Sequence, residues 1–130
     1  MQKIRPLKAL AIAIFSLFFS ALSTVSAAAL ELLMVDQEGC VYCEMWEEQI
    51  APIYPKTAEG RFAPLARIDI SELDNAEVTF ARAINFTPTF VLLEDGRELG
   101  RIEGYPGEDF FWWMLSKLLM DNTSFAGAGG

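Results

Sequence analysis

The sequence predicts a single α/β domain with a mixed four-stranded sheet flanked by helices, in the order β-α-β-α-β-β-α. Three observations predict it. Short apolar segments alternate with segments of helical pattern, which is typical of parallel strands joined by helices. An Asp-Gly turn at Asp95 and Gly96 indicates a hairpin between the last two strands. The length of 130 residues, 52% of them hydrophobic, allows one domain with a packed core.

The first half of the domain is expected to contain two strands and one helix. The apolar segment Leu30–Asp36 has the length and composition of a buried strand. Residues 41–54 are expected to form a helix, because the apolar side chains fall on one face and the glutamates on the others. That apolar face consists of Cys43, Trp46, Ile50 and Tyr54. Two prolines end the helix, and apolar and polar residues then alternate over 62–70, which predicts the second strand.

The second half is expected to add two helices around the hairpin. The expected elements are a helix over residues 71–84, strands over 89–93 and 98–103, and a last helix over 108–120. The first of these helices would turn Leu73, Val78 and Ala81 toward the core. The small and glycine-rich residues 121–130 are expected to form a flexible tail.

The last helix carries aromatic residues on two faces. Phe110, Trp113 and Lys117 share one face, whereas Phe111, Met114, Leu115 and Leu118 share another. Part of this aromatic run must belong to the core. In one interpretation the core accounts for all of it, and in the other the remaining face forms an exposed apolar patch for a partner.

Residues 1–29 have the order of a secretory signal peptide, with cleavage expected near residues 27–29. Three basic residues precede an apolar run over 9–22, and small residues follow it. The run is shorter than the roughly 20 residues of a membrane span, so an uncleaved anchor is the less favoured alternative. Cleavage would leave an exported domain over residues 30–120 and the tail. Seven basic and eighteen acidic side chains would then remain, a net charge of −11.

The composition excludes several classes of site. Because the chain has no histidine, it can form neither a Ser-His-Asp or Cys-His nucleophile nor a His-ligated metal site. Its two cysteines cannot complete a four-cysteine zinc or iron–sulfur site. The net charge of −8 argues against nucleic-acid binding, which needs clustered Lys and Arg. We therefore expect no metal, no organic cofactor and no nucleic acid.

The two cysteines, Cys40 and Cys43, form a Cys-x-x-Cys pair where the first predicted strand meets the first predicted helix. At a helix N-terminus, free backbone N–H groups and the helix dipole stabilise a thiolate on Cys40. Cys40 could then attack an external disulfide, and the shielded Cys43, one turn later, could resolve the mixed disulfide. Three other interpretations stay open. They are a structural disulfide, which would close a very short loop, a zinc half-site shared between two chains, and a chance pair of buried thiols.

Several motifs together resemble the thioredoxin superfamily of thiol-disulfide oxidoreductases, over nearly the whole chain after the signal peptide. They are the strand at residues 32–35, Cys40-Val41-Tyr42-Cys43, Thr87-Pro88-Thr89, the turn at 94–97, and Gly104. The Thr-Pro sequence that follows the cysteine pair makes the resemblance specific, and it implies the thioredoxin fold. Within the superfamily, the sequence is most similar to the small periplasmic thioredoxin-like proteins encoded with bacterial sulfur-oxidation (Sox) systems.

The resemblance implies roles for the residues around the cysteines. It implies a cis peptide bond before Pro88, with Thr87 offering backbone N–H and C=O groups to an extended substrate segment. Tyr42 lies at a motif position that normally faces solvent beside the reactive sulfur, and Val41 precedes it. The expected substrate-binding residues are therefore Val41, Tyr42, Thr87 and Pro88.

Two positions depart from the family pattern. Gly39 stands where thioredoxins usually have tryptophan, and Met34 where they have a buried acid that helps proton transfer to the resolving cysteine. Asp36, Glu38 or water are the candidates to replace that acid. Tyrosine beside the second cysteine, and the acids around the pair, favour reduction or isomerisation over strong oxidation.

The expected function is that of a periplasmic enzyme, a thiol-disulfide oxidoreductase that reduces a disulfide or sulfur adduct on a client protein. The resemblance implies the carrier protein of sulfur oxidation as one such client. The expected partners are the client and a membrane electron donor that restores the dithiol, and the protein itself is expected to be a monomer. The alternative is a non-catalytic partner-binding or regulatory module on the same fold, which Gly39, Met34 and the aromatic last helix keep open.

Overall fold

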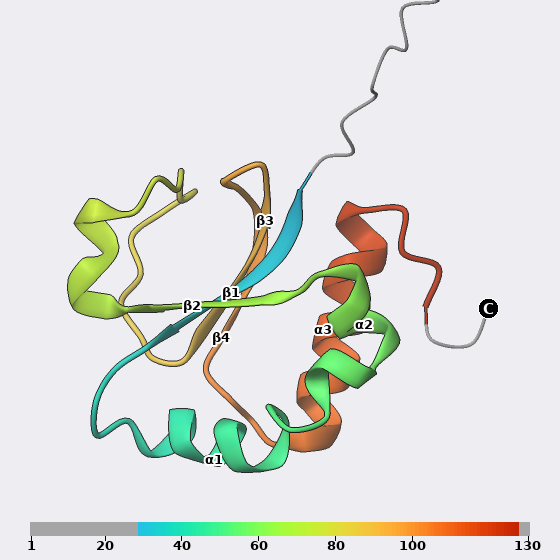
Figure 1. Ribbon diagram of the computed structural model, residues 1–130, viewed down its shortest axis with the longest axis horizontal. Coiled ribbons are helices and arrows are strands. Elements are labelled where there is room, and N and C mark those ends of the chain that lie inside the picture. The colour runs from blue at the N-terminus through green and yellow to red at the C-terminus, as the bar shows by residue number, and fades with distance from the viewer. Residues whose placement is uncertain (1–28, 128–130) are drawn as a thin grey trace, which may run out of the picture.

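The computed structural model describes residues 29–127, whose strands form one mixed sheet (Figure 1). The strands are β1 (Leu30–Asp36), β2 (Leu65–Asp69), β3 (Thr89–Glu94) and β4 (Arg97–Glu103). Their order across the sheet is β2-β1-β3-β4. β1 is parallel to β2 and antiparallel to β3, and β4 is antiparallel to β3. The predicted mixed four-stranded sheet and its hairpin are thus confirmed.

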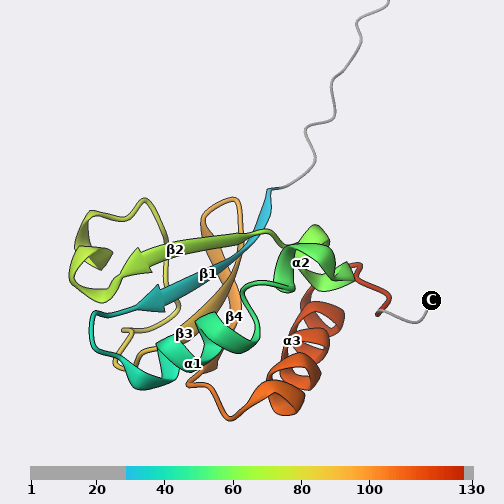
Figure 2. The same ribbon diagram turned by 60° about the horizontal axis from the view of Figure 1, so that its bottom comes forward.

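Within the described range, three α-helices pack on one face of this sheet (Figure 2). They are α1 (Val41–Gln49), α2 (Ala58–Phe62) and α3 (Glu108–Asn122). Two short 3-10 helices complete the fold, η1 (Tyr54–Lys56) between α1 and α2, and η2 (Ile70–Asn75) after β2. No helix in residues 29–127 is long and apolar enough to cross a membrane.

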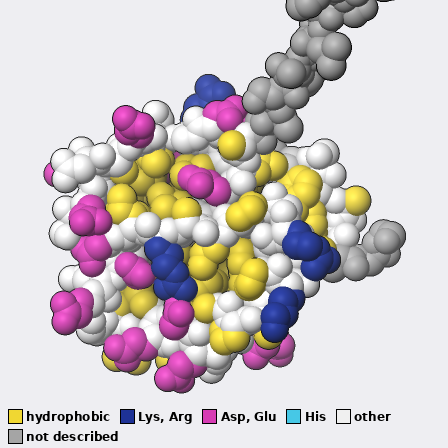
Figure 3. All heavy atoms as spheres, viewed as in Figure 1, with side chains coloured by type: hydrophobic (Ala, Val, Ile, Leu, Met, Phe, Trp, Pro, Cys, Tyr) yellow, Lys and Arg dark blue, Asp and Glu magenta, His cyan; other side chains and the backbone are white. Residues whose placement is uncertain are grey.

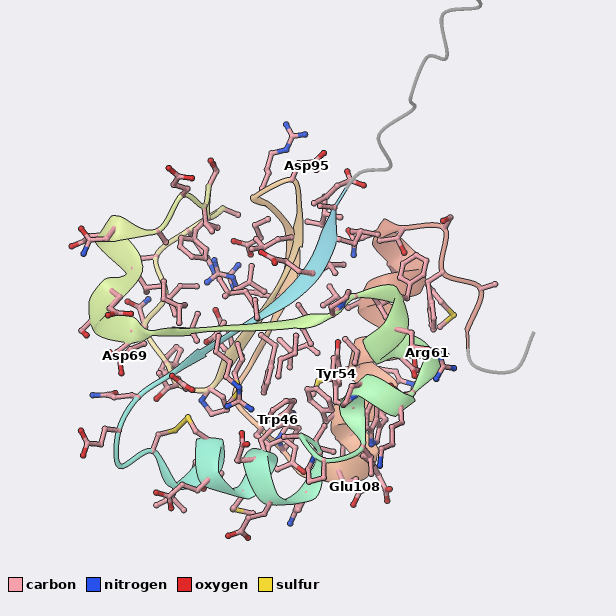
Figure 4. All side chains as sticks on the ribbon, viewed as in Figure 1. Trp46, Tyr54, Arg61, Asp69, Asp95 and Glu108 are labelled. Atoms are coloured by element: carbon pink, nitrogen blue, oxygen red, sulfur yellow. A yellow bond between two sulfur atoms is a disulfide. The ribbon has the colours of Figure 1, made fainter. Side chains whose placement is uncertain are left out.

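The main core lies between these helices and the sheet. Trp46 of α1 is fully buried at its centre, and its ring centroid lies 5.2 Å from that of Phe90 and 5.8 Å from that of Phe111. Tyr54 packs beside it, as the stick view shows (Figure 4). These tilted and edge-on ring pairs are favourable aromatic geometries. The core therefore joins α1, α3 and β3 through one aromatic cluster.

The helices bury the faces that their sequences predict. All four residues of the predicted apolar face of the first helical segment are buried. On α3, Phe111, Leu115 and Leu119 are buried, whereas Phe110 and Trp113 remain exposed. The aromatic run of α3 is therefore divided between the core and the surface.

The other face of the sheet is covered without an α-helix. Four strand residues are buried on it, namely Leu33, Val35, Val91 and Leu93. The apolar residues packed against them come from β2, η2 and the chain that follows η2 as far as Ile84. The two faces of the sheet are thus covered by different kinds of structure.

The predicted helix over residues 71–84 is wrong. After η2, residues 76–88 contain no further helix or strand, and only Thr79 forms a bridge with β4. Val78 and Phe80 pack against the sheet, whereas Thr79 and Ala81 are exposed, so the segment has the two-residue period of an extended chain. β-branched and aromatic side chains favour this backbone over a helix.

The first helix is shorter than predicted, and α2 was not predicted. α1 ends at Gln49, because the ring of Pro52 clashes with a helical turn before it, and the chain continues through η1. At Gly60 of α2, a Cβ atom would lie 1.8 Å from the backbone oxygen of Tyr54, so only glycine fits. Because α2 includes Phe62, β2 begins at Leu65 rather than at residue 62.

The expected flexible tail over residues 121–130 is partly built into the fold. α3 continues to Asn122, and Thr123 then donates its hydroxyl to the Leu119 carbonyl (2.6 Å). Phe125 is buried, with its ring centroid 5.1 Å from that of Phe62. The last aromatic side chain of the sequence therefore closes the end of the core. Residues 128–130 lie outside the described range.

The predicted signal peptide lies, except for Ala29, outside the described residues, so it stays a prediction together with its cleavage site near residues 27–29. Ala29 is tied to the hairpin turn between β3 and β4. Its N–H donates to Asp95 Oδ1 (2.9 Å), and the Asp95 N–H donates to the Ala29 carbonyl (2.9 Å).

Candidate active site

The two cysteines lie where β1 ends and α1 begins. β1 ends at Asp36, a short loop follows, and Cys40 is the N-cap of α1. The backbone N–H of Cys43 donates to the Cys40 sulfur (3.2 Å). Gly39 turns the chain into the helix with a φ of +75°, a conformation that favours glycine. Cys40 therefore occupies the helix N-terminus, where the free N–H groups and the dipole stabilise a thiolate.

Cys40 and Cys43 are joined by a disulfide, with their Cα atoms 5.2 Å apart. The bond between the two sulfur atoms is visible at the start of α1 (Figure 4). Cys43 is only 7% exposed, whereas Cys40 is more accessible. This asymmetry fits external attack at Cys40 and resolution by Cys43.

The proline loop lies at the same edge of the sheet. The Thr87–Pro88 peptide bond is cis, the conformation that the family resemblance implies. Thr89, the first residue of β3, pairs with Val35 near the end of β1, so the loop lies beside the chain that leads to Cys40. The buried Pro88 accepts a hydrogen bond on its carbonyl from the N–H of Gly104 (2.7 Å).

The backbone of Thr87 is open to an incoming chain. Thr87 lies outside β3, two residues before Thr89, which pairs with Val35 of β1. β1 has already ended there, at Asp36. Among residues 29–127, none forms a hydrogen bond with the backbone N–H or C=O of Thr87. These groups can therefore pair with an extended segment of another molecule.

Exposed apolar side chains surround this edge. Val41 and Tyr42, in the first turn of α1, are each more than half exposed. Phe86 is 60% exposed and directly precedes Thr87. Sequence reasoning missed Phe86, although a large apolar residue next to the Thr-Pro sequence was a signal for it. The three side chains give the site an apolar rim.

A cleft of about 470 Å³ is lined in part by Cys43. Its lining includes Met34, Asp36 and Glu38, so two of the three candidates for the missing acid border the same space as Cys43. Burial raises the pKa of Asp36 above its ordinary value, against the opposing attraction of Arg67. The cleft therefore brings a partly buried carboxyl group to the resolving cysteine.

Arg67 of β2 lies across this cleft from α1. It forms an ion pair with Glu47, and its guanidinium lies 3.8 Å from the Asp36 carboxylate and 5.6 Å from the centroid of the Trp46 ring. Glu44 and Glu48 also line the cleft. Acidic side chains gather along the edge of the molecule formed by η2 and α1 (Figure 3), which we call the acidic edge. The described part of the chain contains no cluster of three or more Cys, His, Asp or Glu side chains that could hold a metal ion.

Comparison with known proteins agrees with this geometry. The chain matches the thioredoxin-like domain family over residues 20–119. It is 53% identical to the periplasmic thioredoxin SoxS from Paracoccus pantotrophus, solved in its reduced form, with a TM-score of 0.66 over 68% of this chain and 94% of SoxS. A thioredoxin from Fasciola hepatica, 20% identical, shows the same fold with a TM-score of 0.52 over 69% of this chain and 81% of that one.

Among curated proteins, Thioredoxin H2-1 of Oryza sativa subsp. japonica is 37% identical over 78 residues. This match covers 57% of the present chain and 51% of the rice protein, so the chain spans about half the length of that relative. The family match, by contrast, covers most of the chain and includes both cysteines and the proline loop. The chain therefore has the thioredoxin fold and belongs to the thioredoxin-like domain family.

Proposed function

We propose that this protein reduces a disulfide, or a sulfur adduct on a cysteine, of a client protein. The observation that carries the proposal is the position of the Cys40–Cys43 disulfide beside the cis Thr87–Pro88 bond, at one edge of the sheet. The accessible sulfur of Cys40 and the open backbone of Thr87 can then engage the same client segment. Val41, Tyr42 and Phe86 would contact apolar residues on either side of the client cysteine.

The proposed reaction has two steps. In the reduced protein, the Cys40 thiolate attacks one sulfur of the client disulfide and bonds to it, and the other client sulfur leaves as a thiolate that takes up a proton. The Cys43 thiolate then attacks the Cys40 sulfur, forms the Cys40–Cys43 disulfide and releases the second client thiol. Two electrons pass to the client, and a membrane electron donor supplies two electrons and two protons to restore the dithiol.

The proposed place of this reaction is the bacterial periplasm. The signal-peptide pattern of residues 1–29 supports it, and so does the 53% identity to a periplasmic thioredoxin. The client is then an exported protein, and the likeness to SoxS favours the carrier protein of a sulfur-oxidation system. The acidic edge over η2 and α1 disfavours clients with acidic residues next to the reactive cysteine.

We further propose that Asp36 accepts the proton of Cys43 in the second step. Met34 cannot exchange a proton, whereas Asp36 borders the same cleft as Cys43. Because its pKa is raised, its carboxylate is a stronger base than that of an ordinary aspartate. Among the charged groups that act on Asp36, Asp69 and Glu47 raise its pKa further, whereas Arg67 lowers it.

Asp36→Asn is expected to slow the second step by about tenfold or more at neutral pH, because the proton acceptor is lost. In the wild type, this step should slow as the pH falls through the raised pKa of Asp36. The rate of the variant should not show this dependence on pH. Quenched-flow detection of the mixed disulfide checks both expectations. Glu38→Gln is the matched control; slowing by Glu38→Gln alone would assign the role to Glu38.

The proposed function is tested by trapping. A Cys43→Ser variant expressed with residues 1–29 in a sulfur-oxidising bacterium should accumulate a covalent complex through Cys40 in the periplasmic fraction, and reducing agent should release the client. Cys40→Ser is the control and should trap nothing. Absence of any complex, together with no disulfide reduction by the purified wild type, would instead favour a non-catalytic binding module.

A further inference from the structure

A buried ion pair lies on β4, on the sheet face that α1 and α3 do not cover. The side chains of Glu98 and Arg101 are each only 3% exposed. The guanidinium donates twice to the carboxylate, from Nε to Oε1 (2.6 Å) and from Nη2 to Oε2 (2.7 Å). Removing two charges from water costs several kcal/mol per ion, and neither group takes part in the proposed redox steps. The pair therefore needs a separate explanation.

A β-bulge creates the pair. Leu92 pairs with Gly100 and Leu93 pairs with Glu98, so the intervening Leu99 has no partner on β3. In a regular strand, residues three apart point to opposite faces. Because β4 has this extra residue, the side chains of Glu98 and Arg101 point to the same face of the sheet. It is the helix-free face, since Glu98 pairs with Leu93 and Arg101 pairs with Val91. A local irregularity of β4 thus brings the two charges together.

The pair binds the backbone of the segment that precedes the proline loop. The Ala81 N–H donates to Glu98 Oε2 (2.7 Å). Arg101 donates from Nη2 to the Arg82 carbonyl (2.8 Å) and from Nη1 to the Ala83 carbonyl (3.1 Å). Three consecutive residues are therefore fixed by side chains. They lie in the extended segment that replaces the predicted helix and has few backbone hydrogen bonds of its own.

The proline loop begins directly after these residues. Ala83 is held by Arg101 on β4, and Pro88 is held by Gly104 directly after β4 (2.7 Å). Between the two anchors lie only residues 84–87, which include Phe86 and Thr87. The Thr89 hydroxyl also donates to the Phe86 carbonyl (2.7 Å), which fixes the turn from inside. The position of the substrate-binding backbone is thus set from both ends by β4.

We propose that the Glu98–Arg101 pair is a positioning device that holds the proline loop in register for an extended client segment. The inference rests on the proposed function and adds to it two residues remote from the disulfide. Arg101 acts through Ala83 and does not touch the client. Only a guanidinium fits, because it bonds a carboxylate and two carbonyls at once, whereas the ammonium of lysine is a compact single group.

The test separates binding of a protein client from chemistry at the sulfurs. The double variant Glu98→Gln/Arg101→Met removes both charges and leaves no buried ion unpaired, so it should fold. Its KM for insulin as the protein disulfide should rise on the order of tenfold, since small misplacements of binding groups have large effects. Its kcat, its reduction potential and its rate with the small disulfide of Ellman's reagent should stay at wild-type values. Arg101→Lys should behave in the same way.

Two control variants isolate the effect. Arg82→Gln removes the exposed ion pair of Arg82 with Glu103 (2.7 Å) but leaves the backbone bonds, so its KM should be that of the wild type. Leu119→Ala weakens the core on the other sheet face and should lower stability without raising KM.

Trypsin cleavage after Arg82 should accelerate in the double variant relative to the wild type, because residues 81–83 are no longer held by side chains of β4.

The outcomes decide between separate hypotheses. A wild-type KM in the double variant would overturn the positioning role of the pair and leave the proposed function standing. An equal loss of rate with insulin and with Ellman's reagent, or an equal rise of KM in Leu119→Ala, would show that the pair supports only the general fold and would also overturn it. A wild-type protein that reduces neither substrate would overturn the proposed function, and the inference with it.

Discussion

Replacing Cys40 by serine is expected to lower the rate of disulfide reduction on the order of 10³-fold or more, as when other enzymes lose their nucleophile. A serine hydroxyl at the N-terminus of α1 is not ionised near neutral pH, so no group remains that can attack the client sulfur. Cys40 is the more accessible of the two sulfurs, and Cys43 is nearly inaccessible. Stopped-flow reduction of a peptide disulfide by the pre-reduced protein measures the loss.

Cys43→Ser should lose turnover equally but keep the first step. One equivalent of client thiol should appear at near the wild-type rate, after which the protein stays bonded to the client through Cys40. Met45→Ser is the matched control, because it replaces a neighbouring, partly exposed sulfur side chain of α1 and should react as the wild type does. Equal rates in the wild type and both cysteine variants would contradict the enzymatic role. If only Cys40→Ser released one equivalent of client thiol, Cys43 would be the attacking cysteine and Cys40 the resolving one.

Phe111→Ala is expected to destabilise the fold by about 3–5 kcal/mol, the usual effect of deleting a buried phenylalanine. Phe111 is fully buried, and its ring centroid lies 5.0 Å from that of Phe90 and 5.8 Å from that of Trp46. The deletion leaves a cavity where α1, α3 and β3 meet, and it removes edge-on ring contacts. Urea unfolding, followed by circular dichroism, measures the change in the free energy of unfolding.

The adjacent residue provides the control. Phe110 has the same side chain in the same helix but is 65% exposed, so Phe110→Ala should change stability by no more than about 0.5 kcal/mol. Comparable losses in the two variants would contradict the division of the aromatic run of α3 between core and surface.

The strands were predictable from the sequence because their signals are local. Leu30–Asp36 is a short apolar run of strand length, and the Asp-Gly turn fixes the hairpin between β3 and β4. The extended segment over residues 76–88 was not predictable in the same way. Val78 and Phe80 fit an extended chain, but Leu73, Val78 and Ala81 also fit one face of a helix. Only the contacts of this segment with the sheet distinguish the two structures.

The same distinction between local signals and contacts made only in the fold applies to the candidate site. Cys40 and Cys43 are neighbours in the sequence, so the pair and its place at a helix start could be predicted from local pattern. The cis bond before Pro88 came only from the family resemblance, because nothing local distinguishes it from a trans proline. The Glu98–Arg101 pair could not be predicted, since it depends on an unpaired Leu99 that becomes visible only when β3 and β4 are aligned.

α1 and α3 cover one face of the sheet, and an extended segment covers the other. The two sides should therefore differ in the free energy of local unfolding. Helix amides are protected by hydrogen bonds within the helix, above the larger core. Residues 76–88 have few backbone hydrogen bonds and pack on a smaller apolar cluster. In hydrogen exchange, this segment should behave as a separate cooperative unit that opens at lower free energy than the whole fold. The frame that holds the disulfide should therefore stay closed when this segment opens.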